Sequence, residues 1–295
     1  MATELNLDAT DARVHGAYFE PVDVPDGEDP GYDYFQPTGA TVSVWSKDIQ
    51  HGGPPTGLLV RAMEQAADPA DGQEFSRVTM EILGAVGLGL NRVRTSIPRP
   101  GRQISQVAAE LDVKQPDGSW RTVARTVAWR LKRADSSPIA RLPHEPLPTR
   151  PADLPTMIGF PDLEGAAVPW GRVGFIGTVE IAGQPGRNGE TPAVWLRPLL
   201  PLVAGEETSP LASAFTVIDV ANGLGATLNP LEWSWMNTDT TVHLVSQPVS
   251  EWIGIDSSMA AGGDGYGASF ADLYDETGFL GRSAQTVLLS KVDAG

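Results

Sequence analysis

The chain of 295 residues repeats one order of predicted elements twice. In each half, a short strand-like run precedes an apolar helical segment, and four strand-like runs separated by turn signals follow it. The helical segments cover about residues 56–67 and 209–225, and aligning them without gaps places Glu64 opposite Asp219. Two units of a helix and an antiparallel meander predict an α+β chain built by duplication.

The second helical segment carries a single acid in an apolar stretch. Ser209 is a good N-cap, Pro210 suits the first helical position, and Gly223 can adopt the conformation in which helices end. Asp219 lies in the middle of this segment. Because burying an unpaired carboxylate costs several kcal/mol or more, we expect Asp219 to be hydrogen-bonded or functional.

The strand-like runs are recognised by their period of two. Short strands are expected at 40–45 and 194–202, one before each helix. The meander of the first half is expected at 77–86, 91–97, 103–113 and 120–133, and that of the second half at 237–245, 251–261, 265–275 and 281–291. These runs divide the chain into an N-terminal extension (1–37) that reads as loop, a first unit (38–133), a proline-rich linker (134–190) and a second unit (191–295).

Composition excludes several classes of function. The chain has no cysteine, which rules out disulfides, thiolate metal sites and a cysteine nucleophile. The net charge of −16 argues against a nucleic-acid partner. Four histidines lie too far apart in sequence for a metal motif, so neither a metal nor another cofactor is expected. No signal-like N-terminus or membrane-length apolar run is present, so we expect a cytoplasmic protein without membrane attachment.

A strand, a long buried helix and a meander that wraps it form a hotdog unit. Through the run HGGPPTGLLVRAMEQA (51–66) and the duplicated order, the chain resembles the acyl-CoA thioesterase II family of double-hotdog proteins. The resemblance implies a double hotdog with an N-terminal thioesterase-superfamily hotdog and a C-terminal hotdog. It also implies that a fatty acyl-CoA is hydrolysed to free acid and coenzyme A without a cofactor.

The resemblance assigns three catalytic positions. The family uses an Asp on the second helix, a Thr on the following strand and a Gln on the last strand, which match Asp219, Thr238 and Gln285 by order and spacing. Thr240 and Thr241 are alternatives for the threonine. The carboxylate would take a proton from a water that the other two side chains orient.

Other residues are candidates for binding or for an alternative site. Backbone N–H groups of Gly52 and Gly53, at the start of the first helix, can stabilise an oxyanion or bind substrate. Glu64 is the alternative catalytic residue, and one working site and one degenerate site are expected. A basic strip of Arg92, Arg94, Arg99 and Arg102 could meet the phosphates of coenzyme A.

Two other functions stay open. A non-catalytic protein that binds acyl-CoA or an acyl chain would keep the pocket without the chemistry. A hotdog enoyl-CoA hydratase would need an Asp and His pair, and no histidine follows Asp219 within its helix. Because hotdog sheets leave edges and faces to bury, a homodimer or higher homo-oligomer is expected.

Overall fold

A computed structural model describes residues 15–161, 164, 174–183 and 193–292. The predicted N-terminal extension therefore lies outside the described residues over 1–14. The predicted linker lies outside them over 162–163, 165–173 and 184–190. The structure describes the predicted first unit in full and the predicted second unit except for residues 191–192 and 293–295.

The first unit is an antiparallel sheet on which one helix packs. Helix α1 (Gly53–Ala66) lies against strands in the order β1-β2-β4-β5-β6-β3. Their bounds are β1 Phe19–Val22, β2 Asp33–Pro37, β3 Gln73–Ile82, β4 Asn91–Arg99, β5 Ile104–Lys114 and β6 Trp120–Lys132. The helix starts at Gly53 because prolines 54 and 55 suit its first turn. The predicted meander of the first half is confirmed.

The second unit repeats this plan with a shorter helix. Its strands follow the order β11-β14-β13-β12-β9-β8-β7, and β10 also pairs with β14. Their bounds are β7 Thr156–Ile158, β8 Val179–Ala182, β9 Val194–Pro198, β10 Trp233–Asn237, β11 Asp239–Leu244, β12 Ile253–Ala261, β13 Tyr266–Asp275 and β14 Gly278–Lys291. Helices α2 (Pro210–Ile218) and α3 (Ala221–Gly225) follow β9. Short 3-10 turns occur at Gly39–Thr41, Pro69–Asp71, Ser137–Ile139, Pro151–Asp153 and Ile176–Thr178.

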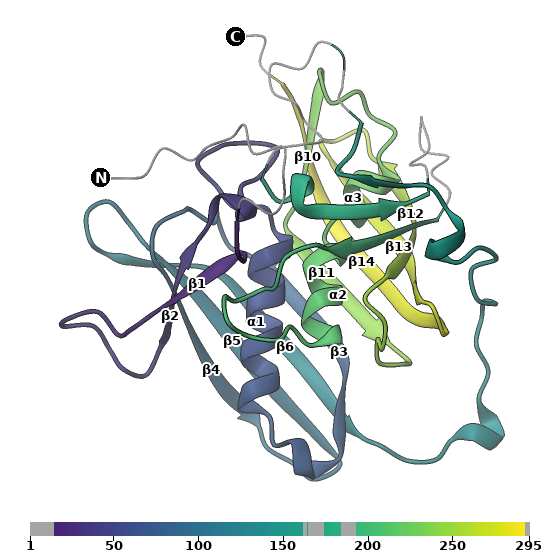
Figure 1. Ribbon diagram of the computed structural model, residues 1–295, viewed down its shortest axis with the longest axis horizontal. Helices are drawn as coiled ribbons and strands as arrows, with labels where there is room; N and C mark the ends of the chain where they lie inside the picture. Colours follow the sequence, from purple (N-terminus) through teal and green to yellow (C-terminus); the bar gives the residue numbers. More distant parts are fainter. Residues whose placement is uncertain (1–14, 162–163, 165–173, 184–192, 293–295) are drawn as a thin grey trace.

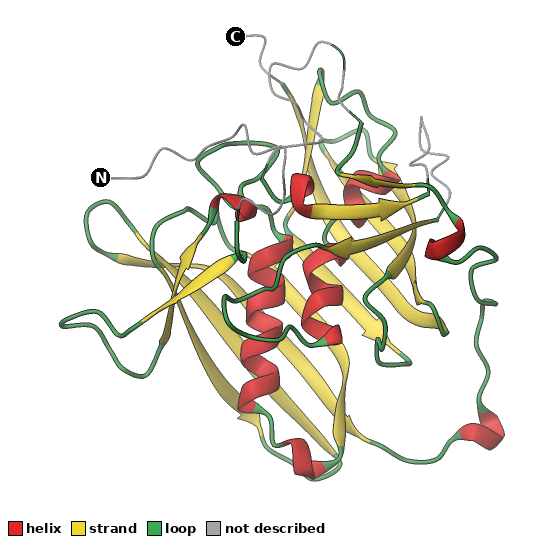
Figure 2. Ribbon diagram, viewed as in Figure 1, coloured by secondary structure: helices red, strands yellow, loops and turns green. Residues whose placement is uncertain are grey.

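The two sheets join edge to edge. Strand β3 pairs with β11 in antiparallel register, with Thr79 opposite Thr241, and the hydroxyl groups of these two residues are 3.2 Å apart. The pairing makes one continuous 14-stranded sheet. Figures 1 and 2 show α1 and α2 side by side on the same side of it. The structure is therefore the predicted α+β double hotdog.

The two helices run in opposite directions and touch through glycines. A Cβ on Gly53 would lie 2.2 Å from the carbonyl oxygen of Thr216, and one on Gly57 would lie 2.2 Å from the Thr216 hydroxyl and 3.1 Å from the Ala212 carbonyl. Only a residue without a side chain fits so close a helix–helix approach. The start of α1 is thereby placed against the end of α2, which is where Asp219 lies.

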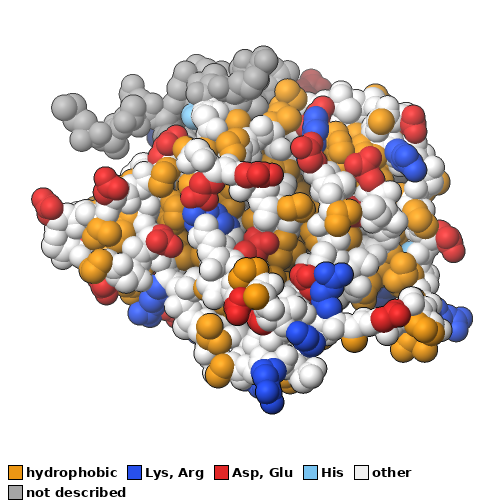
Figure 3. Space-filling model, turned by 60° about the horizontal axis from the view of Figure 1, so that its bottom comes forward, with side chains coloured by type: hydrophobic (Ala, Val, Ile, Leu, Met, Phe, Trp, Pro, Cys, Tyr) orange, Lys and Arg blue, Asp and Glu red, His pale blue; other side chains and the backbone are white. Residues whose placement is uncertain are grey.

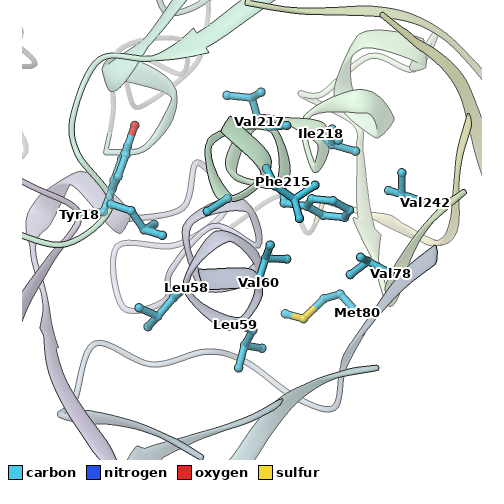
Figure 4. Packing of buried hydrophobic residues seen from close by; sticks show 14 of the residues in the cluster. Tyr18, Leu58, Leu59, Val60, Val78, Met80, Phe215, Val217, Ile218 and Val242 are labelled. Carbon is cyan, nitrogen blue, oxygen red and sulfur yellow. The ribbon is translucent and has the colours of Figure 1, made fainter. Parts of the chain in front are cut away.

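The core lies between the helices and the sheet. Leu58 and Leu59 of α1 are fully buried, and Phe215 of α2 is 1% exposed. Figure 4 shows Phe215 pointing toward Val78 and Val242, which come from β3 and β11. Burying each such side chain stabilises the fold by roughly 1.5–3 kcal/mol, so the two units share one core across the β3–β11 junction.

Three local predictions are wrong. The segment 209–225 is two helices instead of one, because residues 219 and 220 form a turn in which Val220 N donates to Val217 O, although their dihedral angles stay helical. The expected strand at 40–45 overlaps the 3-10 turn Gly39–Thr41, whose N-cap Thr38 accepts a hydrogen bond from Ala40 N. Residues 33–37, expected as loop, form strand β2, which pairs with β4.

The surface carries both signs of charge. Figure 3 shows acidic side chains spread over the face that it presents, with basic ones among them. Among the described residues, no helix combines the length and apolar character that crossing a membrane requires.

Candidate active site

Asp219 is a buried carboxylate held at both oxygens. It caps the C-terminus of α2, and its side chain is 4% exposed. Oδ1 accepts a hydrogen bond from Asn237 Nδ2 at 2.7 Å, and Oδ2 lies 2.9 Å from His51 Nδ1. Hydrogen bonds to a carboxylate are among the stronger ones in proteins, so the expectation that Asp219 is hydrogen-bonded is confirmed.

His51 comes from the other unit. It precedes α1, its backbone N–H donates to Thr41 O at 2.8 Å, and its ring packs on Phe175 with centroids 4.7 Å apart. The close packing of α1 on α2 places the imidazole against Asp219. Two neighbours compete for Nδ1: Gly53 N donates a long hydrogen bond to it at 3.4 Å, and the carboxylate of Asp219, which only accepts hydrogen bonds, lies closer at 2.9 Å.

Gln285 and Thr240, which lie on the sheet, continue the hydrogen-bond network around Asp219. Gln285, on β14 and 1% exposed, donates from Nε2 to Thr240 Oγ1 at 3.0 Å and to the Asp219 carbonyl oxygen at 3.2 Å. Asn237 also reaches Thr240 Oγ1, at 3.3 Å. Gln285 Oε1 is buried and has no hydrogen-bond partner among the described residues. An unpaired buried acceptor is costly, and here it can receive a hydrogen bond from water or substrate.

Thr238 does not join this group. It is exposed, and its hydroxyl lies near Asp239 and the Thr286 carbonyl oxygen, at 3.4 and 3.5 Å. The inward face shifts by one residue where β10 ends and β11 begins, because inward positions are odd up to Asn237 and even from Thr240 onward. A strict period of two across 237–245 misses this irregularity. Of the candidate threonines, Thr240 lies beside Gln285, whereas Thr241 contacts Thr79.

Gly52 and Gly53 complete this end of α1. A Cβ on Gly52 would lie 2.8 and 2.9 Å from the two carboxylate oxygens of Asp219, so only glycine fits there. Pro54 and Pro55 have no N–H group. The amide donors at the start of α1 are therefore those of Gly52 and Gly53, beside Asp219 and at the positive end of the helix dipole.

The opposite end of the helix pair holds Glu64. Its Oε2 accepts a hydrogen bond from Ser209 Oγ at 2.6 Å, and burial raises its pKa. It lines a cavity of about 240 Å³ next to the ion pair of Arg61 with Glu206. Glu64 therefore lies at the far end of the helix pair from Asp219.

The Glu64 end lacks the polar partners on the sheet. In the first unit, the pair that corresponds to Thr240 and Gln285 is Val78 and Ala128, which face each other on β3 and β6 and are fully buried. By the same alignment, Glu206 occupies the place of His51. Among the described residues that line this cavity there is no histidine, and the sheet has apolar side chains in place of the amide–hydroxyl pair, so the two ends carry different chemistry.

Sequence reasoning missed His51 and Asn237. His51 directly precedes the two glycines of the helix start, and this position is the signal that could have found it. Asn237 stands one residue before the predicted threonine, and Asn222 holds its amide by donating to Oδ1 at 3.4 Å. Contacts between residues so far apart in sequence depend on how the units pack.

Two arginines of the basic strip are paired with acids within the protein. Arg92 is paired with Asp112 and Glu28, at 2.9 and 3.7 Å, and its guanidinium stacks on Tyr32. Arg94 pairs with Glu110 at 2.6 Å. These arginines support the sheet surface, and we do not assign them to coenzyme A.

Comparison with known proteins identifies the two units. Residues 41–131 match the model of the acyl-CoA thioesterase N-terminal domain, and residues 151–289 match that of the acyl-CoA thioesterase C-terminal domain. No curated protein matches the chain significantly.

Solved structures share the fold. A hot dog fold protein of unknown function from Alicyclobacillus acidocaldarius is 14% identical with a TM-score of 0.64, over 90% of this chain and 96% of that one. A proposed thioesterase from Novosphingobium aromaticivorans is 18% identical with a TM-score of 0.63, over 92% and 98%. An acyl-CoA thioesterase II from Mycobacterium marinum is 12% identical with a TM-score of 0.59, over 92% and 96%. The two domain models together span most of the chain in the right order, and it therefore belongs to the acyl-CoA thioesterase family.

Proposed function

We propose that this protein hydrolyses a fatty acyl-CoA to a free fatty acid and coenzyme A, using a water molecule that is activated by Asp219 and the polar side chains around it. One observation carries the proposal: a buried carboxylate, held by His51 and Asn237, lies beside the hydrogen-bonded pair Thr240 and Gln285. Family membership supports the reaction class, and these side chains can activate the water that the reaction needs.

Each part of the group has a role in thioester hydrolysis. The reaction needs a water that is oriented and deprotonated, and donors for the oxyanion that forms on the carbonyl. The unpartnered Oε1 of Gln285 can accept a hydrogen bond from that water. The imidazole–carboxylate pair takes the proton, and the Gly52 and Gly53 amides can stabilise the oxyanion. Thr240 holds the Gln285 amide in place.

Release of thiol from a series of acyl-CoAs of increasing chain length tests the proposal. The wild-type protein should turn over at least part of the series. Asp219→Asn should lower kcat by about 10²–10⁴, the usual value of general-base assistance. Glu64→Gln, the matched change at the other end of the helix pair, should stay active. A wild-type protein that releases no thiol from any acyl-CoA of the series would refute the proposal. Loss of activity only in Glu64→Gln would show that the active site is at Glu64.

Hydration of an enoyl-CoA is a second candidate, because one specific observation favours it. The sequence counts against a hydratase because no histidine follows Asp219 within its helix. That argument loses its force, since His51 of the other unit lies 2.9 Å from Asp219. Loss of the enoyl chromophore without thiol release would identify this activity. Binding of acyl-CoA without turnover of either kind would identify the non-catalytic alternative.

The outer face of the second sheet supports a homodimer. Met236, Leu288 and Tyr266 align across β10, β14 and β13, and they are 39, 48 and 60% exposed. Such a row of exposed apolar side chains is typical of an interaction surface. Light scattering should give twice the monomer mass, and Leu288→Lys should shift the protein toward monomer. A wild-type protein that stays monomeric at all accessible concentrations would contradict this assembly.

A further inference from the structure

The His51–Asp219 pair contains two groups that could take the proton from water, and the structure distinguishes them. Both carboxylate oxygens of Asp219 already have a polar neighbour, since Oδ1 accepts a hydrogen bond from Asn237 and Oδ2 lies 2.9 Å from His51 Nδ1. Nε2 of His51 has no hydrogen-bond partner among the described residues. Once Nδ1 is protonated, Nε2 bears the free lone pair of a neutral imidazole.

Accessibility favours the same atom. The His51 side chain is 11% exposed, whereas that of Asp219 is 4% exposed. The imidazole is also fixed in place, by the Thr41 hydrogen bond to its backbone, by Phe175 against its ring and by Asp219 at Nδ1. Among the described residues, Asp219 is the charged group in contact with it. The pair thus has the arrangement in which a carboxylate sets the tautomer and the imidazole acts as base.

The tautomer also determines which amide is free. Gly53 N lies 3.4 Å from His51 Nδ1, a contact that would need Nδ1 to accept. That hydrogen bond is long, whereas Nδ1 lies 2.9 Å from Asp219 Oδ2, so a proton on Nδ1 that is directed to Asp219 would release the Gly53 N–H. The Gly53 N–H then remains available at the start of α1 for an oxyanion. Protonation of Nδ1 therefore prepares both the base and a donor.

We propose that Nε2 of His51 is the general base of the hydrolysis and that Asp219 is its positioning residue. This inference rests on the proposed function and names the atom that carries out its first step. Nε2 removes a proton from water while the water oxygen bonds to the thioester carbon, and the carbonyl electron pair moves onto oxygen. When the oxyanion collapses, the C–S bond breaks and the thiolate takes the proton from Nε2. The sum is thioester and water giving carboxylic acid and thiol.

The variant His51→Asn tests the base separately from the pairing. An asparagine amide can still donate to Asp219, but it has no basic nitrogen. If His51 is the base, kcat should fall by about 10²–10⁴, while unfolding in urea should stay close to that of the wild type. His243→Asn, the same change at an exposed histidine of β11, is the control and should retain wild-type activity.

Nitrogen-15 NMR of the histidines supplies a readout that does not depend on turnover. The resonance that disappears in His51→Asn should show the Nδ1–H tautomer in the wild type, and Asp219→Asn should abolish that preference. An active wild type whose His51→Asn variant keeps its kcat within threefold, or a wild-type His51 protonated at Nε2 alone, would overturn the inference and leave the proposed function standing. A wild-type protein that hydrolyses no acyl-CoA would overturn the proposed function itself.

Discussion

Gly53→Ala should separate the two helices and inactivate the protein. The new Cβ would lie 2.2 Å from the Thr216 carbonyl oxygen and 3.1 Å from the Phe175 ring. Because the obstacle is backbone, no side-chain rotation relieves it. The helices must move apart by about 1.2 Å to bring 2.2 Å to the 3.4 Å of an ordinary contact. Overpacking of this kind costs roughly 1–3 kcal/mol of stability.

The same movement acts on the catalytic pair. His51 precedes Gly53 by two residues, and Asp219 follows Thr216 by three, so the displacement reaches both partners. The Nδ1–Oδ2 distance of 2.9 Å would approach 4 Å, beyond any hydrogen bond. A misplacement of about 1 Å can lower the rate 10²-fold, and we expect at least that loss in kcat.

Thiol release and urea unfolding, measured on the same preparation, check this prediction. The matched control is Gly223→Ala, in α3 close to Asp219, because a Cβ there meets nothing within 4 Å. This control should keep its activity, and its stability should stay equal or rise slightly, since alanine favours helix over glycine. A Gly53→Ala protein with wild-type stability and wild-type kcat would refute the reasoning that close helix packing assembles the site.

The remaining predictions concern the threonine of the site and the Glu64 end. Thr240→Val removes the oxygen that accepts a hydrogen bond from Gln285 and should lower kcat about tenfold or more, which is at least about 1.4 kcal/mol. Thr238→Val should leave kcat unchanged. Equal effects of the two substitutions on kcat would contradict the assignment of Thr240 to the site. Ser209→Ala removes the N-cap that accepts from Ala212 N and should cost about 0.5–2 kcal/mol in urea unfolding with little effect on kcat. Because burial raises the Glu64 pKa, the folded state binds the proton more tightly than the unfolded state. Its stabilising contribution is therefore full below the ordinary value of 4.5 and is lost as pH rises through the raised value. Relative to the Glu64→Gln variant, the wild type should lose stability between pH 4.5 and neutral pH, and a pH-independent difference would show that Glu64 is not desolvated.

Local signals were sufficient for much of the fold. Alternation over 104–114 and 120–132 reports strands with one buried face, and the prolines after Gly53 mark a helix start. These signals come from neighbours in sequence, whose geometry the backbone fixes. They fail at Asp219, where a turn interrupts the α-helical hydrogen bonds while the residues around it remain apolar. They also fail at Thr238, where one irregular position between β10 and β11 exchanges the two faces of the strand.

The sequence by itself determined the duplicated order, the buried acid Asp219 and the glutamine on the last strand as candidates. Only the tertiary structure decided the partners of Asp219, because Asn237 and Gln285 come from other strands of its own unit and His51 comes from the other unit. His51 is 168 positions before Asp219, and the antiparallel packing of α1 on α2 brings them to 2.9 Å. The same packing places Glu64 against Ser209, with Val78 and Ala128 where the second unit has Thr240 and Gln285. Periodicity assigns residues to a face, but a hydrogen bond between two units depends on how closely their helices approach, and here glycines set that distance.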